Sequence, residues 1–249
     1  MTRLLASVAD LEELVLAARG GADILDLKDP TAGALGAWPQ ERIASAVALA
    51  RSWPARPPLS ATIGDLPMVP ATVAARVAET RSCGVDYVKV GLFPTGDPSG
   101  CLAALALEAR RGTRLVAVLF ADLWPDARLL PEVARAGFAG AMLDTARKNA
   151  GGLLRHRTLG ELTRFINEAR TLGLLTGLAG SLTLSDIPVL QRCEADYLGF
   201  RTALCAGGDR RGVLDQAALA AVRSAMPAPA VDPREPIRST VPSPVSVSR

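Results

Sequence analysis

The sequence has little of several residue types on which common functions depend. Its single histidine, His156, excludes a metal site built on histidines, and the flanking arginines predict that it lies in a solvated loop. None of the four cysteines belongs to a Cys-x-x-Cys pair, so we expect reduced thiols in a cytoplasmic protein. Aromatic residues make up 4% of the chain and the net charge is +3, which gives no basis for nucleic-acid binding.

Long apolar runs are missing as well. No segment approaches the roughly 20 consecutive apolar residues that a membrane-spanning helix needs, and the N-terminus lacks a signal-peptide pattern. We therefore expect a protein that acts without a membrane. The residue types present also offer no convincing site for a metal or a redox cofactor, so we expect the protein to need none.

Lysine is scarce, with three residues against twenty-five arginines. Arginine keeps its proton at any biological pH, whereas a desolvated lysine amine can lose its proton and attack a carbonyl. Lys28, Lys89 and Lys148 each stand at or just after a short apolar run that is typical of a buried strand. They are candidates for chemistry that arginine cannot perform. The alternative is an accident of composition, in which lysines extend from strand ends into solvent.

Short apolar runs alternate with longer amphipathic runs along the chain. The short runs predict strands over residues 3–8, 22–28, 58–64, 86–91, 114–121, 139–144, 174–179 and 195–201. The longer runs predict helices near residues 10–19, 39–52, 69–83, 98–111, 126–136, 158–172, 183–193 and 214–225. Strands that alternate with crossover helices form a parallel sheet, and eight such units match a (β/α)8 TIM barrel of the α/β class. An open doubly wound sheet is the alternative, but no glycine fingerprint follows the first strand.

The predicted domain boundary falls after residue 226. Residues 1–226 form the expected barrel domain, in which Asp10 and the pair Thr158 and Glu161 are predicted to cap helices. Residues 227–249 carry six prolines and several serines without helical or strand periodicity. We expect this tail to be disordered and to take no part in chemistry.

Charged residues gather where the predicted even-numbered strands end. Side chains alternate along a strand, so Asp26 and Lys28 point the same way, and the barrel brings Lys89 and Asp144 toward them. Lys148 follows about one turn after Asp144. A second cation and burial both lower the pKa of an amine, which favours attack on a carbonyl, and a carboxylate can then move protons. The alternative is an ion-pair network that only stabilises the mouth of the barrel.

Glycine-rich turns follow the seventh and eighth predicted strands. Gly180 and Ser181 lead directly into a helix, and Gly207 and Gly208 follow Arg201. Barrels often bind phosphate in these two loops through bare backbone N–H groups at a helix start, and an arginine adds a two-pronged contact. We expect these residues to bind a substrate phosphate. Glycine turns also occur simply as tight connections, which is the alternative reading.

Four segments together resemble a known family, the (5-formylfuran-3-yl)methyl phosphate synthases, or 4-HFC-P synthases. They are Asp-Leu-Lys-Asp-Pro at 26–30, Asp-Tyr-Val-Lys-Val-Gly at 86–91, Met-Leu-Asp-Thr-Ala-Arg-Lys at 142–148 and Gly-Phe-Arg-Thr-Ala-Leu-Cys at 199–205. The match runs from the first predicted strand to about residue 225. Each motif alone is weak, but the combination is specific.

The resemblance implies a carbon–oxygen lyase acting on phosphates. Such an enzyme condenses two glyceraldehyde 3-phosphate molecules into a furan aldehyde phosphate, an early step toward methanofuran in one-carbon metabolism. By the resemblance, Lys28 forms a Schiff base and Lys89 acts in proton transfer, while Asp26, Asp144 and Lys148 match the remaining polar residues of the site. The expected partner is a triose phosphate, and the expected assembly is a cytoplasmic homo-oligomer.

Two other functions remain open from the sequence. The first is a different barrel enzyme acting on sugar phosphates, such as a class I aldolase or a relative of the orotidylate decarboxylases, whose Asp-x-Lys strand Asp26-Leu27-Lys28 echoes. Those decarboxylases usually need a further aspartate shortly after the lysine, and Asp29 is misplaced for that. The second is a non-catalytic barrel that binds a phosphorylated metabolite.

Overall fold

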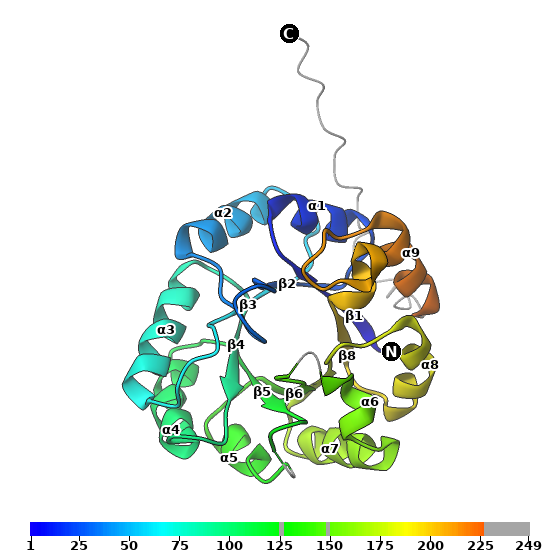
Figure 1. Ribbon diagram of the computed structural model, residues 1–249. Helices are drawn as coiled ribbons and strands as arrows, with labels where there is room; N and C mark the ends of the chain where they lie inside the picture. Colours follow the sequence, from blue (N-terminus) through cyan, green and yellow to red (C-terminus); the bar gives the residue numbers. More distant parts are fainter. Residues whose placement is uncertain (125–126, 148–149, 227–249) are drawn as a thin grey trace.

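Eight parallel strands close into a barrel, and helices form a ring around them (Figure 1). The structure is a computed structural model, and it describes residues 1–124, 127–147 and 150–226. Each strand pairs with its neighbour in the sequence, and the first pairs with the last to close the sheet. The predicted TIM barrel is confirmed. Residues 227–249, where the sequence predicts a loose tail, lie outside the described residues.

The observed strands fall within one residue of the predicted runs at most ends. They are β1 (Arg3–Val8), β2 (Ile24–Leu27), β3 (Leu59–Thr62), β4 (Tyr87–Leu92), β5 (Leu115–Phe120), β6 (Gly140–Asp144), β7 (Leu175–Leu178) and β8 (Tyr197–Phe200). The helices are α1 (Leu11–Arg19), α2 (Gln40–Arg51), α3 (Pro70–Ser82), α4 (Pro98–Arg110), α5 (Leu130–Arg135), α6 (Leu153–His156), α7 (Leu159–Thr171), α8 (Ile187–Leu190) and α9 (Gln216–Ala225). None of the helices in the described ranges is long and apolar enough to cross a membrane.

Both predicted helix caps are confirmed. The Asp10 carboxylate accepts the backbone N–H of Glu13 at 2.8 Å, at the start of α1. Thr158 and Glu161 form a reciprocal capping box at the start of α7. Each cap provides acceptors for N–H groups that the first helical turn leaves without intrahelical partners. These local signals therefore fix where the helices begin after strands β1 and β6.

Two helical regions differ from the sequence prediction. The predicted helix near residues 183–193 is broken into α8 between two 3-10 turns, η2 (Leu184–Asp186) and η3 (Gln191–Cys193), because Pro188 lacks the N–H that a continuous helix needs. His156, predicted to be a solvated loop residue, instead ends the short helix α6. Its Nε2 atom is buried and has no hydrogen-bond partner among the described residues.

The interior of the barrel is filled with side chains rather than hollow. A small apolar cluster that includes Leu5, Ile24, Val116 and Tyr197 lies inside the sheet, while a larger cluster joins the strands to the helices. Gly177 lies opposite Tyr197, and a Cβ atom at position 177 would come within 2.3 Å of the tyrosine ring. Glycine in β7 therefore makes room for this ring. Burial is the larger cause that raises the pKa of Tyr197, and the negative charge of Asp26 is the next. The hydroxyl of Tyr197 therefore stays protonated.

Candidate active site

The carboxyl ends of the strands hold a group of buried charges. Lys89 from β4 donates to Oδ2 of Asp26 from β2 at 2.9 Å, and both side chains are at most 3% exposed. Burial alone would raise the pKa of Asp26, but the charges of Lys89 and Lys28 and the donated hydrogen bonds hold it below the ordinary value. Asp26 is therefore an ionised carboxylate inside the barrel. The predicted meeting of these even-numbered strands is observed here.

Two serine hydroxyls also hold Asp26 in place. Ser7 of β1 donates to Oδ2 at 3.0 Å, and Ser60 of β3 donates to Oδ1 at 2.6 Å. The three residues lie side by side because Ser7 pairs with Asp26, and Asp26 with Ser60, in the strand register. The sequence analysis missed both serines. The available signal was strand alternation, which points Ser7 and Ser60 into the barrel at the level of Asp26.

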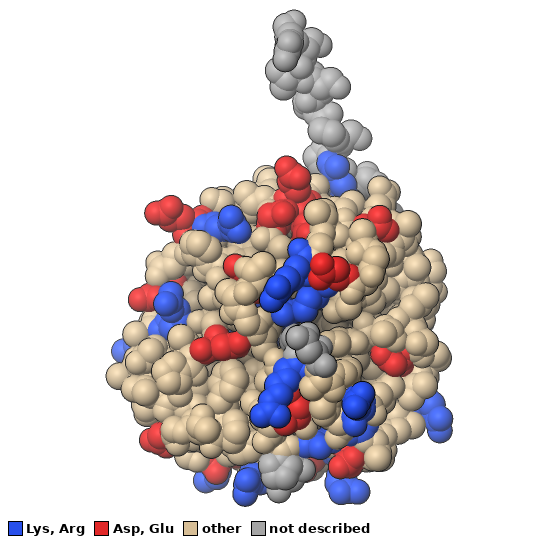
Figure 2. All heavy atoms as spheres, viewed as in Figure 1, with Lys and Arg blue, Asp and Glu red and all other residues tan. Residues whose placement is uncertain are grey.

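A pocket opens above this ion pair. Lys28, Lys89 and Asp144 all line it, and Lys28 is only 6% exposed. Asp144 ends β6 and accepts the backbone N–H of Thr145 at 2.7 Å. Figure 2 shows that lysine and arginine side chains gather near the middle of the face on which Figure 1 looks. The structure thus brings together three of the predicted chemical residues around one space, with Asp26 bonded to one of them.

Lys148, predicted to lean over the same volume, lies outside the described residues. The segment that leads toward it is anchored to the end of β5. Asp122 accepts the backbone N–H groups of Ala146 and Arg147, each at 2.8 Å. These two bonds fix the course of the loop that follows Asp144.

The turn after β7 enters the pocket in an unusual backbone conformation. Gly180 has φ 111° and Ser181 has φ 47°, and both residues line the pocket. A serine with positive φ is uncommon, and such strain occurs often at sites that bind ligands. Gly207 and Gly208, the other predicted phosphate-binding glycines, are exposed in the 3-10 turn η5 (Ala206–Gly208) and do not line this pocket.

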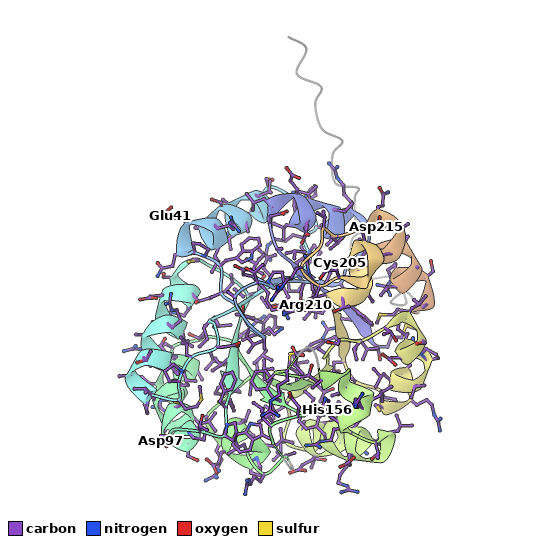
Figure 3. All side chains as sticks on the ribbon, in the orientation of Figure 1. Glu41, Asp97, His156, Cys205, Arg210 and Asp215 are labelled. Atoms are coloured by element: carbon purple, nitrogen blue, oxygen red, sulfur yellow. The ribbon has the colours of Figure 1, made fainter. Side chains whose placement is uncertain are left out.

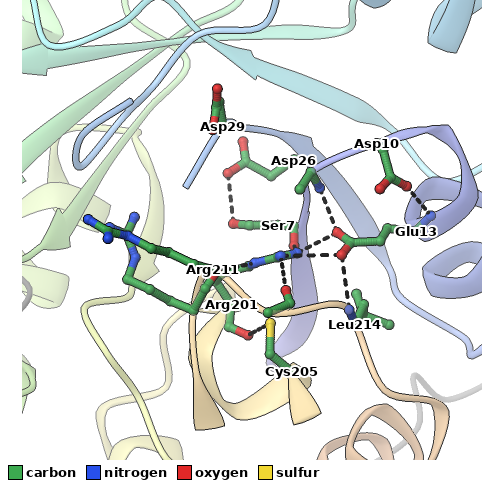
Figure 4. A network of polar contacts seen from close by, with 12 residues as sticks. Ser7, Asp10, Glu13, Asp26, Asp29, Arg201, Cys205, Arg211 and Leu214 are labelled. Carbon is green, nitrogen blue, oxygen red and sulfur yellow. Dashed lines mark hydrogen bonds and ion pairs between the residues drawn. The ribbon is translucent and has the colours of Figure 1, made fainter. Parts of the chain in front are cut away.

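Arg201 also lines the pocket, but its hydrogen bonds go to the protein itself. Its two Nη atoms donate to both carboxylate oxygens of Glu13 and to the backbone oxygens of Ser7 and Gly212, and its Nε donates to the backbone oxygen of Arg210 (Figure 4). A guanidinium has five N–H donors, so protein acceptors occupy all of them. A buried ion pair with Glu13 thus fixes the loop after β8, and the phosphate contact of Arg201 stays a prediction. The sequence did not predict the ion pair between Arg201 and Glu13, because the two residues lie far apart in the chain.

Arg210 is the arginine of this loop that the sequence analysis missed. It lies near the barrel axis in Figure 3, in contrast to Glu41 and Asp97 at the periphery, and it lines the pocket. Its side chain is partly buried, and burial lowers the pKa of its guanidinium from the ordinary value. In the sequence, Arg210 is one of two adjacent arginines shortly after two glycines. This pattern is too common to predict a residue that lines a pocket.

Comparison with known proteins identifies the same family that the four sequence motifs resemble. Residues 4–223 match the family model described as 4-HFC-P synthase. The chain belongs to this family. A protein of Methylorubrum extorquens, provisionally named (5-formylfuran-3-yl)methyl phosphate synthase, is 43% identical over 90% of this chain and 91% of its own length. The (5-formylfuran-3-yl)methyl phosphate synthase of Methanopyrus kandleri is 37% identical over 85% of this chain and 93% of its own.

Several solved structures are similar to this 4-HFC-P synthase family member in their fold. A 3-hexulose-6-phosphate synthase has a TM-score of 0.65 at 19% identity and covers 91% of this chain and 100% of its own. A phosphoribosyl anthranilate isomerase of Thermus thermophilus has a TM-score of 0.60 at 17% identity, over 90% and 98% of the two chains. Identities this low support the shared barrel and nothing finer.

The hydrogen bond from Ser60 gives a first prediction. Ser60→Ala removes a donor that lowers the pKa of Asp26, so the pKa rises and Asp26 takes up a proton at a higher pH. We expect the acid limb of the rate profile to move to higher pH and kcat/KM to fall by about 10-fold, since hydrogen bonds to charged groups contribute roughly 1.5–3 kcal/mol. Steady-state rates measured across the acid range check both effects.

A matched control lies two residues farther along the same strand. The Thr62 hydroxyl is also buried, but it donates to the backbone oxygen of Gly36 at 2.9 Å and not to Asp26. Thr62→Val should leave the position of the acid limb unchanged. An equal shift in both variants would mean that the profile reports general loosening of β3 rather than the proton affinity of Asp26.

Proposed function

We propose that this protein condenses two molecules of glyceraldehyde 3-phosphate into 4-(hydroxymethyl)-2-furancarboxaldehyde phosphate, releasing one phosphate and two water molecules. The observation that carries the proposal is the charged group in the pocket, where Lys28, Lys89 and Asp144 face one space and Lys89 is bonded to Asp26. Related proteins bear the name of the same synthase. The reaction needs an amine, proton carriers and phosphate-binding groups, all of which this end of the barrel offers.

Lys28 is the proposed nucleophile. Its amine attacks the carbonyl carbon of the first triose phosphate, and loss of water from the adduct gives an imine. Lys28 is nearly buried, which keeps bulk water away from the imine. Asp26 lies two residues before it, in β2, and is already hydrogen-bonded to Lys89, Ser7 and Ser60. That arrangement orders the charges around the amine before substrate arrives.

Lys89 and Asp144 are the proposed proton carriers. Removal of a proton next to the imine gives an enamine, and its electrons then expel the phosphate group. After a proton transfer has moved the carbonyl of the second triose phosphate to its C2, the remaining carbon chain forms a carbon–carbon bond at that carbon, so that the CH2–phosphate group becomes the branch at position 4 of the furan. Ring closure with loss of two water molecules then gives the aromatic furan, and hydrolysis of the imine releases its aldehyde and frees Lys28. Aromatisation makes the overall reaction effectively irreversible. Lys148 keeps its proposed place among the polar residues of the site on the family resemblance alone.

The turn of Gly180 and Ser181 is the proposed binding site for a substrate phosphate. Both residues line the pocket, and backbone N–H groups in turns of this type are suited to anions. All four cysteines are free, which fits the reducing conditions of the cytoplasm, where we place the enzyme.

Incubation of the purified protein with glyceraldehyde 3-phosphate alone tests the function. We expect a new ultraviolet-absorbing furan that carries phosphate, together with one inorganic phosphate released per furan. Dihydroxyacetone phosphate or unphosphorylated glyceraldehyde, supplied alone, serves as the control substrate. Accumulation of a six-carbon sugar bisphosphate without a furan would identify an aldolase instead. Binding without any consumption of substrate would identify a non-catalytic barrel.

A further inference from the structure

Arg210 extends from the loop between β8 and α9 over the pocket. Its backbone oxygen accepts the Nε of Arg201 at 2.9 Å, which fixes the base of the residue to the end of β8. Its guanidinium reaches the loop after β2, where Nη2 donates to the backbone oxygen of Gly33 at 3.1 Å. The residue therefore joins the loops after β8 and β2 at the mouth of the barrel.

The Arg210 guanidinium keeps binding capacity for a ligand. Among residues 1–124, 127–147 and 150–226, the Gly33 oxygen is the acceptor that its N–H groups contact. Asp144 and Asp65 act on Arg210 through their charges, without a hydrogen bond to it. This contrasts with Arg201, whose five donors are all occupied. A partly buried arginine with most of its donors available is suited to bind a phosphate with two parallel hydrogen bonds.

The charge of the pocket favours an anion at this point. Among the described residues, its charged lining comprises the cations Lys28, Lys89, Arg201 and Arg210 and the carboxylate of Asp144. Arg201 is neutralised by Glu13, and Lys89 is paired with Asp26. In the part of the chain that the structure describes, no carboxylate is hydrogen-bonded to Arg210, so a ligand anion at this point would meet the positive charge of its guanidinium.

The proposed reaction requires a second site that binds an anion. It joins two phosphate esters, and the turn of Gly180 and Ser181 is proposed to hold one of the two phosphate groups. We propose that Arg210 binds the phosphate of the other triose phosphate at the mouth of the pocket. This inference rests on the proposed function for its substrate, but its central claim, a phosphate-binding arginine in the loop after β8, is testable without turnover.

Equilibrium binding of inorganic phosphate provides the test. At saturation we expect two phosphates per chain for the unmodified protein and one for Arg210→Ala. Arg210→Lys keeps the charge without the planar fork, and should bind the second phosphate about 10-fold more weakly than the unmodified protein. The matched control is Arg211→Ala, which removes the same charge from the exposed neighbouring side chain and should still bind two.

Kinetics and trapping separate this inference from the proposed function. Arg210→Ala should raise KM for glyceraldehyde 3-phosphate by roughly 10-fold or more, because a charged contact to phosphate is lost. Borohydride trapping with unphosphorylated glyceraldehyde should label this variant as fully as the unmodified protein. Two bound phosphates in Arg210→Ala, or fewer than two in the unmodified protein, would overturn the inference. Failure to make a furan while Arg210→Ala still loses one phosphate would overturn the proposed reaction and leave the anion site standing.

Discussion

Lys28→Arg should abolish turnover while the barrel stays folded. Arginine preserves the positive charge near Asp26, but a guanidinium cannot form the imine on which the proposed reaction depends. We expect kcat to fall by roughly 10⁴-fold or more, as for the loss of other covalent nucleophiles. Steady-state furan formation measures the loss, and the melting curve and circular dichroism spectrum measure the fold.

Trapping identifies the nucleophile directly. Borohydride in the presence of glyceraldehyde 3-phosphate should attach a stable label to Lys28, and peptide mapping should find no label in Lys28→Arg. Lys89→Arg is the matched comparison, because Lys89 also lies in the pocket but is paired with Asp26. It should slow turnover yet still allow the label on Lys28. A label on Lys89 in the unmodified protein would mean that Lys89 forms the imine and that Lys28 carries protons.

Glu13→Ala should cause the largest loss of stability. Glu13 and Arg201 form an ion pair in which both side chains are at most 6% exposed, and Glu13 also accepts the backbone N–H groups of Ala9 and Leu214. Removing one partner of a buried pair leaves a buried charge without compensation, which costs about 3–5 kcal/mol. Urea unfolding should show this decrease in the free energy of unfolding.

Glu12→Ala is the control for that measurement. Glu12 precedes Glu13 in the first turn of α1 and carries the same charge, but it is exposed. Its removal should change the free energy of unfolding by about 1 kcal/mol or less, mainly through the helix dipole. Equal losses in the two variants would contradict a stabilising ion pair between Glu13 and Arg201.

The fold was predictable because strand and helix periodicities are local properties of the chain. The alternation within Ile24–Leu27 and Tyr87–Leu92 also indicated that Asp26 and Lys89 point into the barrel. Their ion pair follows from that orientation once the sheet closes. Ser7 and Ser60 were predictable by the same rule, but serine is common and its hydroxyl becomes informative only when a carboxylate lies beside it.

The loops could not be predicted in the same way. Whether Arg201 or Arg210 is available for a ligand depends on Glu13, and no pattern in the sequence links a residue of α1 to the end of β8. The short helix α6 and the strained φ of Ser181 likewise depend on contacts between loops. Such contacts are set by tertiary packing, which propensity and periodicity do not report.

The pairing of Glu13 with Arg201 has a consequence for synthesis on the ribosome. The two residues are 188 positions apart, so at typical rates of about 5–20 residues per second the Glu13 carboxylate waits about ten to forty seconds for its partner. During that time α1 cannot settle in its final environment without burying an unpaired charge. We therefore expect α1, the last strand and the loop after β8 to reach their final packing together.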